Sequence, residues 1–374
     1  MNSINIIENE NSSNQIEADD ELIGNCLDDF EFLKILGEGS FGWVFKIKSK
    51  KNKKLYALKK IKFQNEIKWE KNKKEMILLK YLNHENICKC FQDFKTLDGT
   101  QYMVMKYYDN KDLYKYVEAN IGMNHHIREE IIWNIIFQCL EGLSYLHLQG
   151  IIHCDIKLGN ILMTEEGKIV IGDFGESMVK DNIILQRITK NKDEQNILRY
   201  KKCARGTTGY MAPEVKMNGC DEKTDVYSLG ICFYALLYFT FPDKNMDFNF
   251  SQNNYSKELK QLIKGMIAID PKKRKDLADV KKEFSKFYYQ RYVKNSGFHS
   301  LTQCLLNFSN LRNIISTNSS IIERKETNDK KINVSLILIS IFTNTDIEIN
   351  NYYLKRFFLN NFKKSLKITK IFHH

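Results

Sequence analysis

Two short polar motifs constrain this chain more than any other feature, because their side chains have a use only where the fold brings them together. The first is His153-Cys154-Asp155-Ile156-Lys157-Leu158-Gly159-Asn160, and the second is Asp173-Phe174-Gly175. Asp155 and Asp173 are 18 positions apart (173 − 155). A phosphoryl-transfer site needs such residues. One aspartate orients a substrate hydroxyl, while Asn160 and the other aspartate hold magnesium on nucleotide phosphates.

The composition is that of a globular chain with unevenly distributed charge. Its 374 residues are 43% hydrophobic, enough to form a core in more than one lobe. The net charge is +11, yet no lysine or arginine precedes Lys34. The acidic, polar start predicts a flexible N-terminal arm over residues 1–29. We interpret the basic excess as solvated surface, and we expect no nucleic-acid partner because no aromatic-basic binding module is recognisable.

Cysteine usage and hydropathy indicate a reducing compartment. The nine cysteines are scattered, and the closest pair, Cys88 and Cys90, matches no common zinc spacing. No charged, apolar leader begins the chain. The longest apolar run, residues 334–342, is shorter than the about 20 residues that span a bilayer. We therefore expect a cytoplasmic location, with the nucleus as the alternative.

Hydrophobic periodicity changes along the chain. Short, partly alternating runs at residues 32–36, 44–47, 56–59 and 101–108 predict strands, and residues 66–82 have the spacing of a helix. From residue 112 onward the apolar residues recur at helical intervals, as in residues 131–148 and 225–239. A small strand-rich lobe followed by a larger helical lobe predicts an α+β, bilobal architecture.

A glycine-rich segment, Gly37-Glu38-Gly39-Ser40-Phe41-Gly42, precedes the polar motifs. Glycines allow backbone amides to approach phosphates without a side chain in the way. A plain hairpin turn and a dinucleotide-binding loop are the alternatives, but that loop leads into a helix. Here strand-like residues continue on both sides, which favours a hairpin that covers a nucleotide.

Lys59 follows Gly42 by 17 positions (59 − 42) on a strand that we expect to be buried. A buried lysine is costly unless an acid pairs with it. Glu75, which opens the apolar part of the helix at residues 66–82, is the preferred partner, with Glu66 and Glu70 as competitors. The alternative is a solvated lysine among several, because Lys60 and Lys62 are close by.

Taken together and in this order, the motifs resemble those of a eukaryotic protein kinase domain of the serine/threonine type, over residues 30–289. The resemblance implies an N-lobe over residues 30–106, a C-lobe over residues 109–289 and an activation segment over residues 173–214. It also implies ATP and Mg²⁺ as cofactors, and ATP and protein substrates as partners.

The resemblance implies a role for each site residue. Asp155 would be the catalytic base, assisted by Lys157 and Thr207, and these two residues together argue for Ser/Thr specificity. Asn160 and Asp173 would bind magnesium. The residues expected to hold ATP are Gly37, Glu38, Gly39, Ser40, Phe41, Gly42, Val44, Ala57, Lys59, Glu75, Met105, Lys106, Tyr108, Asp112 and Leu162.

Further residues match the structural framework of such a domain. Leu79, Cys90, His153 and Phe174 would stack in a core that couples the lobes. Asp225 would anchor the backbone of the loop that carries Asp155, and Glu214 and Arg274 would form a buried salt bridge in the large lobe. Asp109 is the alternative to Asp112 for contact with the ribose or a substrate.

One position departs from the family pattern. Cys154 stands where most protein kinases have the arginine that binds a phosphate on the activation segment. The usual phosphoacceptor position, three before Gly206, holds Cys203. Because both halves of that switch are missing, we expect activity that does not depend on phosphorylation there. A Cys154–Cys203 disulfide is an alternative that we do not favour in a reducing compartment.

Two segments carry no familiar motif. Residues 181–202 lengthen the activation segment, and we expect a disordered surface insert; a regulatory segment with Ser177, Thr189 and Tyr200 as modification sites is the alternative.

Residues 290–374 form a C-terminal extension in which Leu354, Phe358, Phe362 and Leu366 recur among basic residues. This spacing fits a basic amphipathic helix, and we favour docking on the kinase lobe or a partner over a membrane surface.

Three functions remain compatible with these residues. An active Ser/Thr kinase is favoured, because Lys59, Asp155, Asn160 and Asp173 are all present. A pseudokinase or scaffold with the same fold is the alternative. A small-molecule kinase is disfavoured, because residues 206–214 resemble the segment that builds a peptide groove.

Overall fold

The computed structural model describes residues 23–39, 42–61, 65–109, 112–123, 126–199, 205–240, 248–250 and 255–288. The chain divides into two units, Met1–Gly297 and Phe298–His374, and every described residue lies in the first. The predicted amphipathic helix of the tail, Ser40, Phe41, Tyr200 and Cys203 lie outside the described residues.

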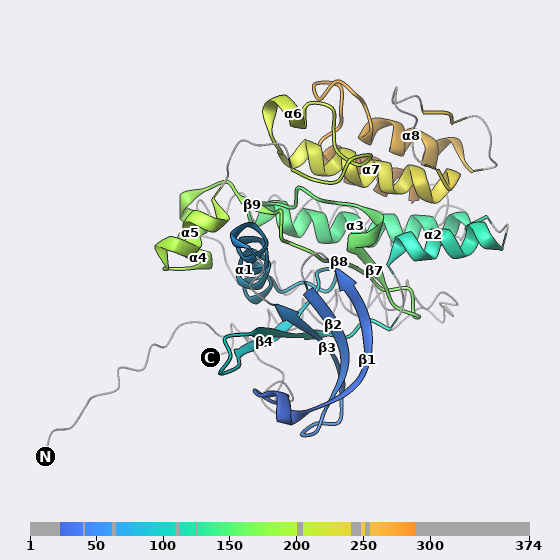
Figure 1. Cartoon of the computed structure of the whole chain (residues 1–374). Helices are drawn as coiled ribbons and strands as arrows, with labels where there is room; N and C mark the ends of the chain where they lie inside the picture. The colour runs from blue at the N-terminus through green and yellow to red at the C-terminus, as the bar shows by residue number, and fades with distance from the viewer. Residues whose placement is uncertain are drawn as a thin grey trace, which may run out of the picture. The chain divides into compact units, whose positions relative to one another are not determined.

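A five-stranded antiparallel sheet forms the N-terminal lobe (Figure 1). Its strands lie in the order β1 (Phe30–Gly39), β2 (Gly42–Ser49), β3 (Leu55–Ile61), β5 (Gln101–Lys106) and β4 (Cys90–Lys95). Side chains alternate between the two faces of a strand. On β3, Tyr56 and Leu58 therefore pack into one apolar cluster, while Ala57 and Ile61 belong to the other, which extends into the helical lobe.

Residues 23–29, which were predicted to belong to a flexible N-terminal arm, are attached to the N-terminal lobe. Ile23 is 1% exposed and packs with Phe30 and Ile47 against the sheet. The Ile23 carbonyl accepts a hydrogen bond of 2.6 Å from the Ser49 hydroxyl, and a 3-10 helix, η2 (Leu27–Asp29), leads into β1. Two apolar residues, Ile23 and Leu27, thus attach the end of an otherwise acidic stretch to the lobe.

Helix α1 (Glu66–Tyr81) is the single helix predicted for the small lobe. The Asn65 side chain caps it by accepting a 2.9 Å hydrogen bond from the Lys68 amide. Its buried face carries Ile77, Leu78 and Leu79, and the helix lies against β4. The same face also carries the charged Glu75, which is buried and faces Lys59 of β3.

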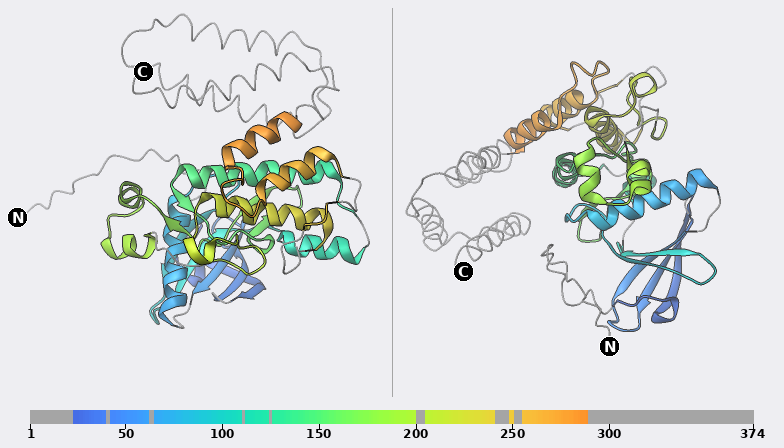
Figure 2. Two further views of the ribbon diagram at one scale, coloured as in Figure 1. Left: turned by 90° about the horizontal axis from the view of Figure 1, so that it is seen from above. Right: turned by 90° about the vertical axis from the view of Figure 1, so that its left-hand side faces the viewer.

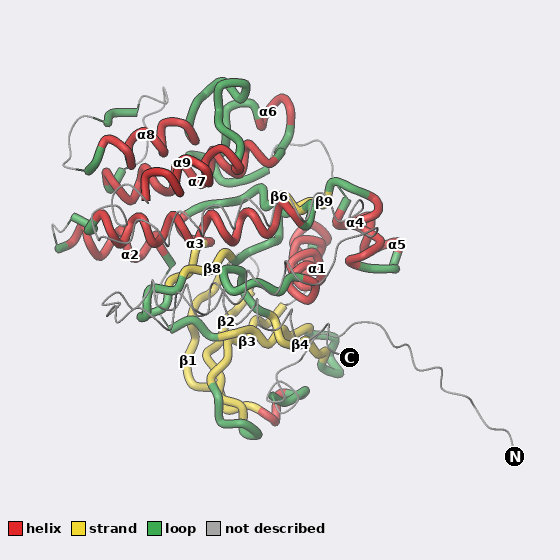
Figure 3. Tube along the Cα trace, turned by 180° about the vertical axis from the view of Figure 1, so that it is seen from behind, coloured by secondary structure: helices red, strands yellow, loops and turns green. Residues whose placement is uncertain are grey.

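Helices make up most of the second lobe: α2 (Leu113–Gly122), α3 (Glu129–Leu148), α6 (Val215–Asn218), α7 (Glu222–Tyr238), α8 (Lys257–Met266) and α9 (Leu277–Tyr288) (Figures 1 and 3). Helix α7 is buried all round, as expected for an apolar helix at the centre of a lobe. The α+β, bilobal architecture is confirmed. Among the described residues no helix has the length and hydropathy needed to cross a bilayer.

The expected disordered insert in the activation segment is wrong for residues 182–198. They form two short helices, α4 (Asn182–Ile188) and α5 (Lys192–Leu198), which lie against α1 (Figure 2). Asp181 and Asn191 cap their first turns. Leu185 and Leu198 are at most 1% exposed. Two caps and two apolar anchors order a segment whose overall composition is polar.

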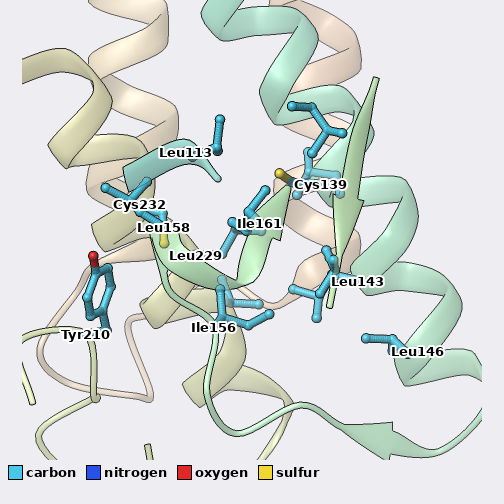
Figure 4. Packing of buried hydrophobic residues seen from close by; sticks show 14 of the residues in the cluster. Leu113, Cys139, Leu143, Leu146, Ile156, Leu158, Ile161, Tyr210, Leu229 and Cys232 are labelled. Atoms are coloured by element: carbon cyan, nitrogen blue, oxygen red, sulfur yellow. The ribbon is translucent and has the colours of Figure 1, made fainter. Parts of the chain in front are cut away.

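Two small sheets hold the loops of the large lobe that carry the polar motifs. Strand β6 (Ile151–Ile152) pairs with β9 (Met178–Val179), and β7 (Ile161–Met163) pairs with β8 (Ile169–Ile171). Between β6 and β7 the chain turns through a 3-10 helix, η3 (Leu158–Asn160). Figure 4 shows Ile156, Leu158 and Ile161 packed near Leu143 of α3 and Leu229 of α7. Apolar contacts with these two helices therefore fix the loop between β6 and β7.

Candidate active site

The loop between β6 and β7 is fixed by Asp225 of α7. The Asp225 carboxylate accepts hydrogen bonds from the backbone amides of His153 (2.8 Å) and Cys154 (2.9 Å), and His147 Nε2 lies 2.9 Å from it. Asp225 is 1% exposed. These bonds hold Cys154 at φ +67°, a region that side-chain-bearing residues seldom adopt. The anchoring predicted for Asp225 is present in the structure.

Pairing of β7 with β8 brings the two polar motifs together. Ile161 lies opposite Ile171, and the Gly172 amide donates a 2.9 Å hydrogen bond to the Asn160 carbonyl. Asn160 and Asp173, 13 positions apart (173 − 160), therefore lie at the same end of one short ladder. Asp173 itself has φ +60°, which turns the chain sharply after the strand.

Asp155 lies in a closed triangle with Lys157 and Thr207. The Thr207 hydroxyl donates to Asp155 Oδ1 at 2.6 Å, and Lys157 Nζ donates to Asp155 Oδ2 at 2.7 Å and to Thr207 Oγ1 at 3.0 Å. Burial alone would raise the pKa of Asp155, but the bonds from Lys157 and Thr207 outweigh it, and the net shift of the pKa is downward. The carboxylate is therefore ionised and oriented.

Asn160 offers an oxygen ligand next to this triangle. Its Nδ2 donates 2.8 Å to the Asp155 carbonyl, so Oδ1 is the end of the amide left to accept or to ligate. An amide oxygen with the Asp173 carboxylate is a donor set that suits Mg²⁺, which takes one or two protein oxygens and completes its shell with phosphates and water. Over the described residues, no group of three or more His, Cys, Asp or Glu side chains is placed to hold a metal.

Lys59 of β3 pairs with Glu75 of α1, and both side chains are at most 8% exposed. Of the three acids considered, the structure places Glu75 opposite the lysine, while Glu66 lies exposed in the first turn of α1. Burial would lower the pKa of Lys59, but the charges of Glu75 and Asp173 raise it above its usual value. Lys59 is therefore a charged group that pairs with Glu75 and is stabilised by the charge of Asp173.

The glycine-rich segment forms the end of the β1–β2 hairpin, where Gly39 lies opposite Gly42. Gly42 has φ +127°, and a Cβ there would come within 2.2 Å of the Lys60 carbonyl. A Cβ on Gly37 would meet no atom within 4 Å, so this backbone is open to an approaching group. The side chain of Glu38 lies outside what the structure describes, as do Ser40 and Phe41.

The apolar residues expected around adenine come from both lobes. Val44, Ala57 and Met105 lie on adjacent strands, with Ala57 opposite Met105, and Leu162 lies on β7. Their roles stay predictions.

The polar residues predicted for this region are engaged with the protein itself. The Lys106 side chain is exposed, while its amide donates 2.9 Å to the Lys89 carbonyl. The Tyr108 hydroxyl accepts 3.3 Å from the Lys89 amide. Asp112 caps α2 by accepting 2.9 Å from the Lys115 amide, and Asp109 accepts 3.3 Å from the Glu165 amide. Asp112 thus has a local structural task in addition to any contact with a nucleotide.

The predicted stacked core is assembled at the junction of the lobes. Leu79, Cys90 and Phe174 belong to one apolar cluster, and the rings of His153 and Phe174 are 5.1 Å apart. His153 is fully buried, and its Nε2 lies 3.0 Å from the Gly172 carbonyl. The motif that supplies Asp155 is therefore packed directly against the motif that supplies Asp173.

Sequence reasoning missed an ion-pair hub at Glu176. Its carboxylate pairs with Lys71 of α1 and with Arg205 of the activation segment, the latter at 3.2 Å. Lys74 is buried nearby, where burial and the Arg205 charge lower its pKa to about 8. One signal was available, since Lys71 precedes Glu75 by four residues and so shares its helix face. The partner acid on another segment had no such signal.

Ser177 was proposed as a modification site, and the structure contradicts this. Its side chain is fully buried and donates 3.2 Å to the His153 carbonyl. Thr189 is half-buried and donates 2.5 Å to Glu194. Cys154 is a free thiol, and because Cys203 lies outside the described residues, the alternative disulfide between them stays a prediction.

The predicted salt bridge of the large lobe joins Glu214 and Arg274 by two bonds, 2.5 Å and 3.0 Å long. Arg274 is 1% exposed, and its guanidinium carbon lies 4.7 Å from the centre of the Tyr227 ring. The pair ties the end of the activation segment to the segment before α9.

Comparisons with known proteins agree with this geometry. The family model for the protein kinase domain matches residues 30–284. Serine/threonine-protein kinase Nek5 of Mus musculus is 31% identical over 67% of this chain, and an Aurora kinase of Dictyostelium discoideum is 31% identical over 68% of it. A probable serine/threonine-protein kinase nek2 of Dictyostelium discoideum is 28% identical over 68% of the chain.

The chain spans 36% of the length of the mouse Nek5 relative, 62% of the nek2 relative and 65% of the Dictyostelium Aurora kinase. The match with the family model covers more than half of this chain, and the Nek5 and nek2 relatives are named serine/threonine-protein kinases. The chain belongs to the protein kinase family and carries a protein kinase domain of the serine/threonine type.

Proposed function

We propose that this chain is an active, ATP-dependent serine/threonine protein kinase. The observation that carries the proposal is the triangle of Asp155, Lys157 and Thr207, which holds an ionised carboxylate within hydrogen-bond reach of two donors. Beside it stand the oxygen ligands of Asn160 and Asp173 and the buried pair of Lys59 and Glu75. A scaffold would not need these groups to stay paired and oriented.

Each residue has a definite task in such a transfer. Asp155 accepts the proton of the attacking serine or threonine hydroxyl, and Thr207 fixes the direction of its carboxylate. Lys157 places a positive charge beside the transferring phosphate, and Lys59 places another on the phosphates that stay behind. Magnesium, when bound by Asn160 and Asp173, supplies further positive charge against the phosphate oxygens.

Labelled ATP tests the proposal on the full chain. With generic protein substrates, we expect label on serine and threonine, because Lys157 and Thr207 stand beside Asp155. Phosphoamino-acid analysis of the products is the measurement. Phosphotyrosine as the main product would refute the specificity, and label on a small molecule with none on protein would favour the small-molecule alternative.

We further propose that activity does not depend on phosphorylation at the position of Cys203. The support is the ion-pair hub, in which the Glu176 carboxylate already joins α1 to the activation segment through Lys71 and Arg205. A phosphate bound by an arginine does the same work in many kinases. Here a side chain that the protein always carries supplies the negative charge.

Phosphatase treatment is therefore expected to leave kcat unchanged, whereas Glu176→Gln is expected to lower it about tenfold or more. A charged hydrogen bond contributes about 1.5–3 kcal/mol, and about 1.4 kcal/mol corresponds to a tenfold change in rate. The matched control is Glu222→Gln, which breaks an exposed pair with Lys180 and should leave kcat unchanged. Loss of activity on dephosphorylation, restored by one phosphate near residue 203, would contradict this proposal.

The remaining expectations stay predictions. They are a cytoplasmic or nuclear location, the absence of a nucleic-acid partner, the domain limits at residues 30 and 289, and docking of the basic tail on the kinase lobe or a partner.

A further inference from the structure

Two cysteines face the same small cavity behind the catalytic aspartate. The cavity has a water-accessible volume of about 10 Å³ and is lined by Cys154, Asp155, Arg205, Cys220 and Asp225, among others. A volume of about 10–15 Å³ holds one water-sized molecule between polar partners. Cys154 is 6% exposed and Cys220 is 2% exposed, so the cavity is the space in which a small reagent meets both thiols.

Both thiols line this one cavity, and each donates a hydrogen bond to a backbone carbonyl, Cys154 Sγ to Ile152 at 3.6 Å and Cys220 Sγ to Arg205 at 3.7 Å. Their backbones are fixed by one element, α7. The Cys154 amide donates to Asp225 at 2.9 Å, and Cys220 immediately precedes Asp221, which caps α7. Neither sulfur is in a disulfide, since the seven cysteines within the described ranges are all free thiols.

The surroundings of the two thiols shift their pKa values in opposite directions. The neighbouring Cys154 side chain lowers the pKa of the Cys220 thiol, against the opposing effect of burial. Burial, and after it the Cys220 side chain, raise the pKa of the Cys154 thiol. A thiolate is the reactive form of cysteine. Cys220 is therefore the thiol suited to attack an oxidant, and Cys154, which lines the same cavity, is the thiol that an oxidised Cys220 meets.

We propose that Cys154 and Cys220 form a reversible disulfide with hydrogen peroxide and that this bond switches the kinase off. The Cys220 sulfur attacks one peroxide oxygen, the O–O bond breaks, and one water leaves with the thiol proton. The Cys154 sulfur then displaces the hydroxyl from the resulting sulfenic acid, and its proton leaves with that hydroxyl as a second water. Two thiols are oxidised by two electrons, and one peroxide is reduced to two waters.

Formation of the bond disturbs the site from both sides. A disulfide brings the sulfurs to about 2.05 Å, which is far inside hydrogen-bond distance. Cys154 adjoins Asp155, and Cys220 Sγ must leave the Arg205 carbonyl, now 3.7 Å away. Arg205 leads into Gly206 and Thr207, and a Cβ on Gly206 would lie only 2.7 Å from the Cys154 carbonyl.

We expect inhibition because the segment that carries Cys154 and Asp155 packs tightly against the segment from Arg205 to Thr207. The Thr207–Asp155 contact of 2.6 Å joins the residue next to Cys154 to the segment that Cys220 contacts through the Arg205 carbonyl. A displacement of about 1 Å at a reacting group can cost about 100-fold in rate. We therefore expect oxidised protein to lose activity about 10- to 100-fold.

The experiment treats the full chain with graded hydrogen peroxide and measures two quantities on each sample. A non-reducing peptide map detects the bond, and transfer of label from ATP measures activity. We expect a peptide joined through Cys154 and Cys220, with the loss of two hydrogens, to appear as activity falls. Dithiothreitol should reverse both changes.

Three variants assign the effect, each compared with its own untreated sample. Cys220→Ser and Cys220→Ala should keep their activity in peroxide, because no bond to Cys154 can form. The matched control is Cys26→Ser, which alters an exposed thiol and should stay as sensitive as the wild type. If both Cys220 variants fail to fold, the wild-type peptide map still decides whether the disulfide exists.

Three outcomes would overturn the proposal: no joined peptide, equal inactivation of the Cys220 variants and the wild type, or a complete disulfide with unchanged activity. The inhibition rests on the proposed kinase function, whereas the peptide map does not. A chain without activity in any state would refute the proposed function and leave the disulfide measured on its own.

Discussion

Replacing Asp155 with asparagine is expected to lower kcat by about 10²–10⁴-fold, the usual contribution of a general base. The amide can still accept the hydrogen bond from Thr207, now 2.6 Å long, so the local geometry should survive. It cannot take the proton of the substrate hydroxyl, and it no longer pairs as an ion with Lys157. Steady-state transfer of label from ATP measures the loss.

The control for this change is Asp279→Asn, because Asp279 is exposed on α9 and takes no part in the site. It should leave kcat unchanged, and both variants should melt close to the wild type. Equal labelling by wild type and Asp155→Asn would end the active-kinase proposal and favour the scaffold, since binding alone does not need a base.

Replacing Arg274 with alanine is expected to destabilise the fold by about 3–5 kcal/mol, the cost of breaking a buried ion pair from one side. The change leaves the Glu214 carboxylate without its two bonds and removes further bonds to the carbonyls of Ala268 (2.9 Å) and Lys223 (3.2 Å). Chemical denaturation gives the free energy of unfolding. In a domain of this size, each kcal/mol lowers the melting temperature by about 2–4 °C.

The neighbouring Lys275→Ala is the matched control. Lys275 pairs with Glu283, and its side chain is 31% exposed. Such a pair contributes about 0–1 kcal/mol, so its loss should be hard to detect. If Arg274→Ala unfolds at the wild-type temperature, the salt bridge does not stabilise the lobe and its structural assignment is wrong.

Much of the site could be predicted because its chemistry lies in short, fixed spacings. Asp155, Lys157 and Asn160 share one loop, and their relative positions follow from a few peptide bonds. The pairing of Lys59 with Glu75 was also accessible, since a charged side chain on a buried strand demands a partner and Glu75 opens the apolar part of α1.

The predictions for the insert and for residues 23–29 were wrong for one physical reason. Composition reports average polarity, whereas a few apolar residues and caps decide whether a short segment docks. Leu185 and Leu198 attach α4 and α5, and Ile23 attaches the end of the acidic stretch. Ser177 was judged from its residue type alone, and only packing reveals that it is buried against the catalytic loop.

The sequence by itself determined the chemical groups, their order along the chain and the change from strand to helix, because local propensity and spacing encode these. Only the tertiary structure decided which distant groups meet. Glu176 could have paired with any of many lysines, and Cys154 lies 66 positions from Cys220 (220 − 154). Such contacts depend on how α7 and the activation segment pack, and the spacing of residues along the sequence does not predict that packing.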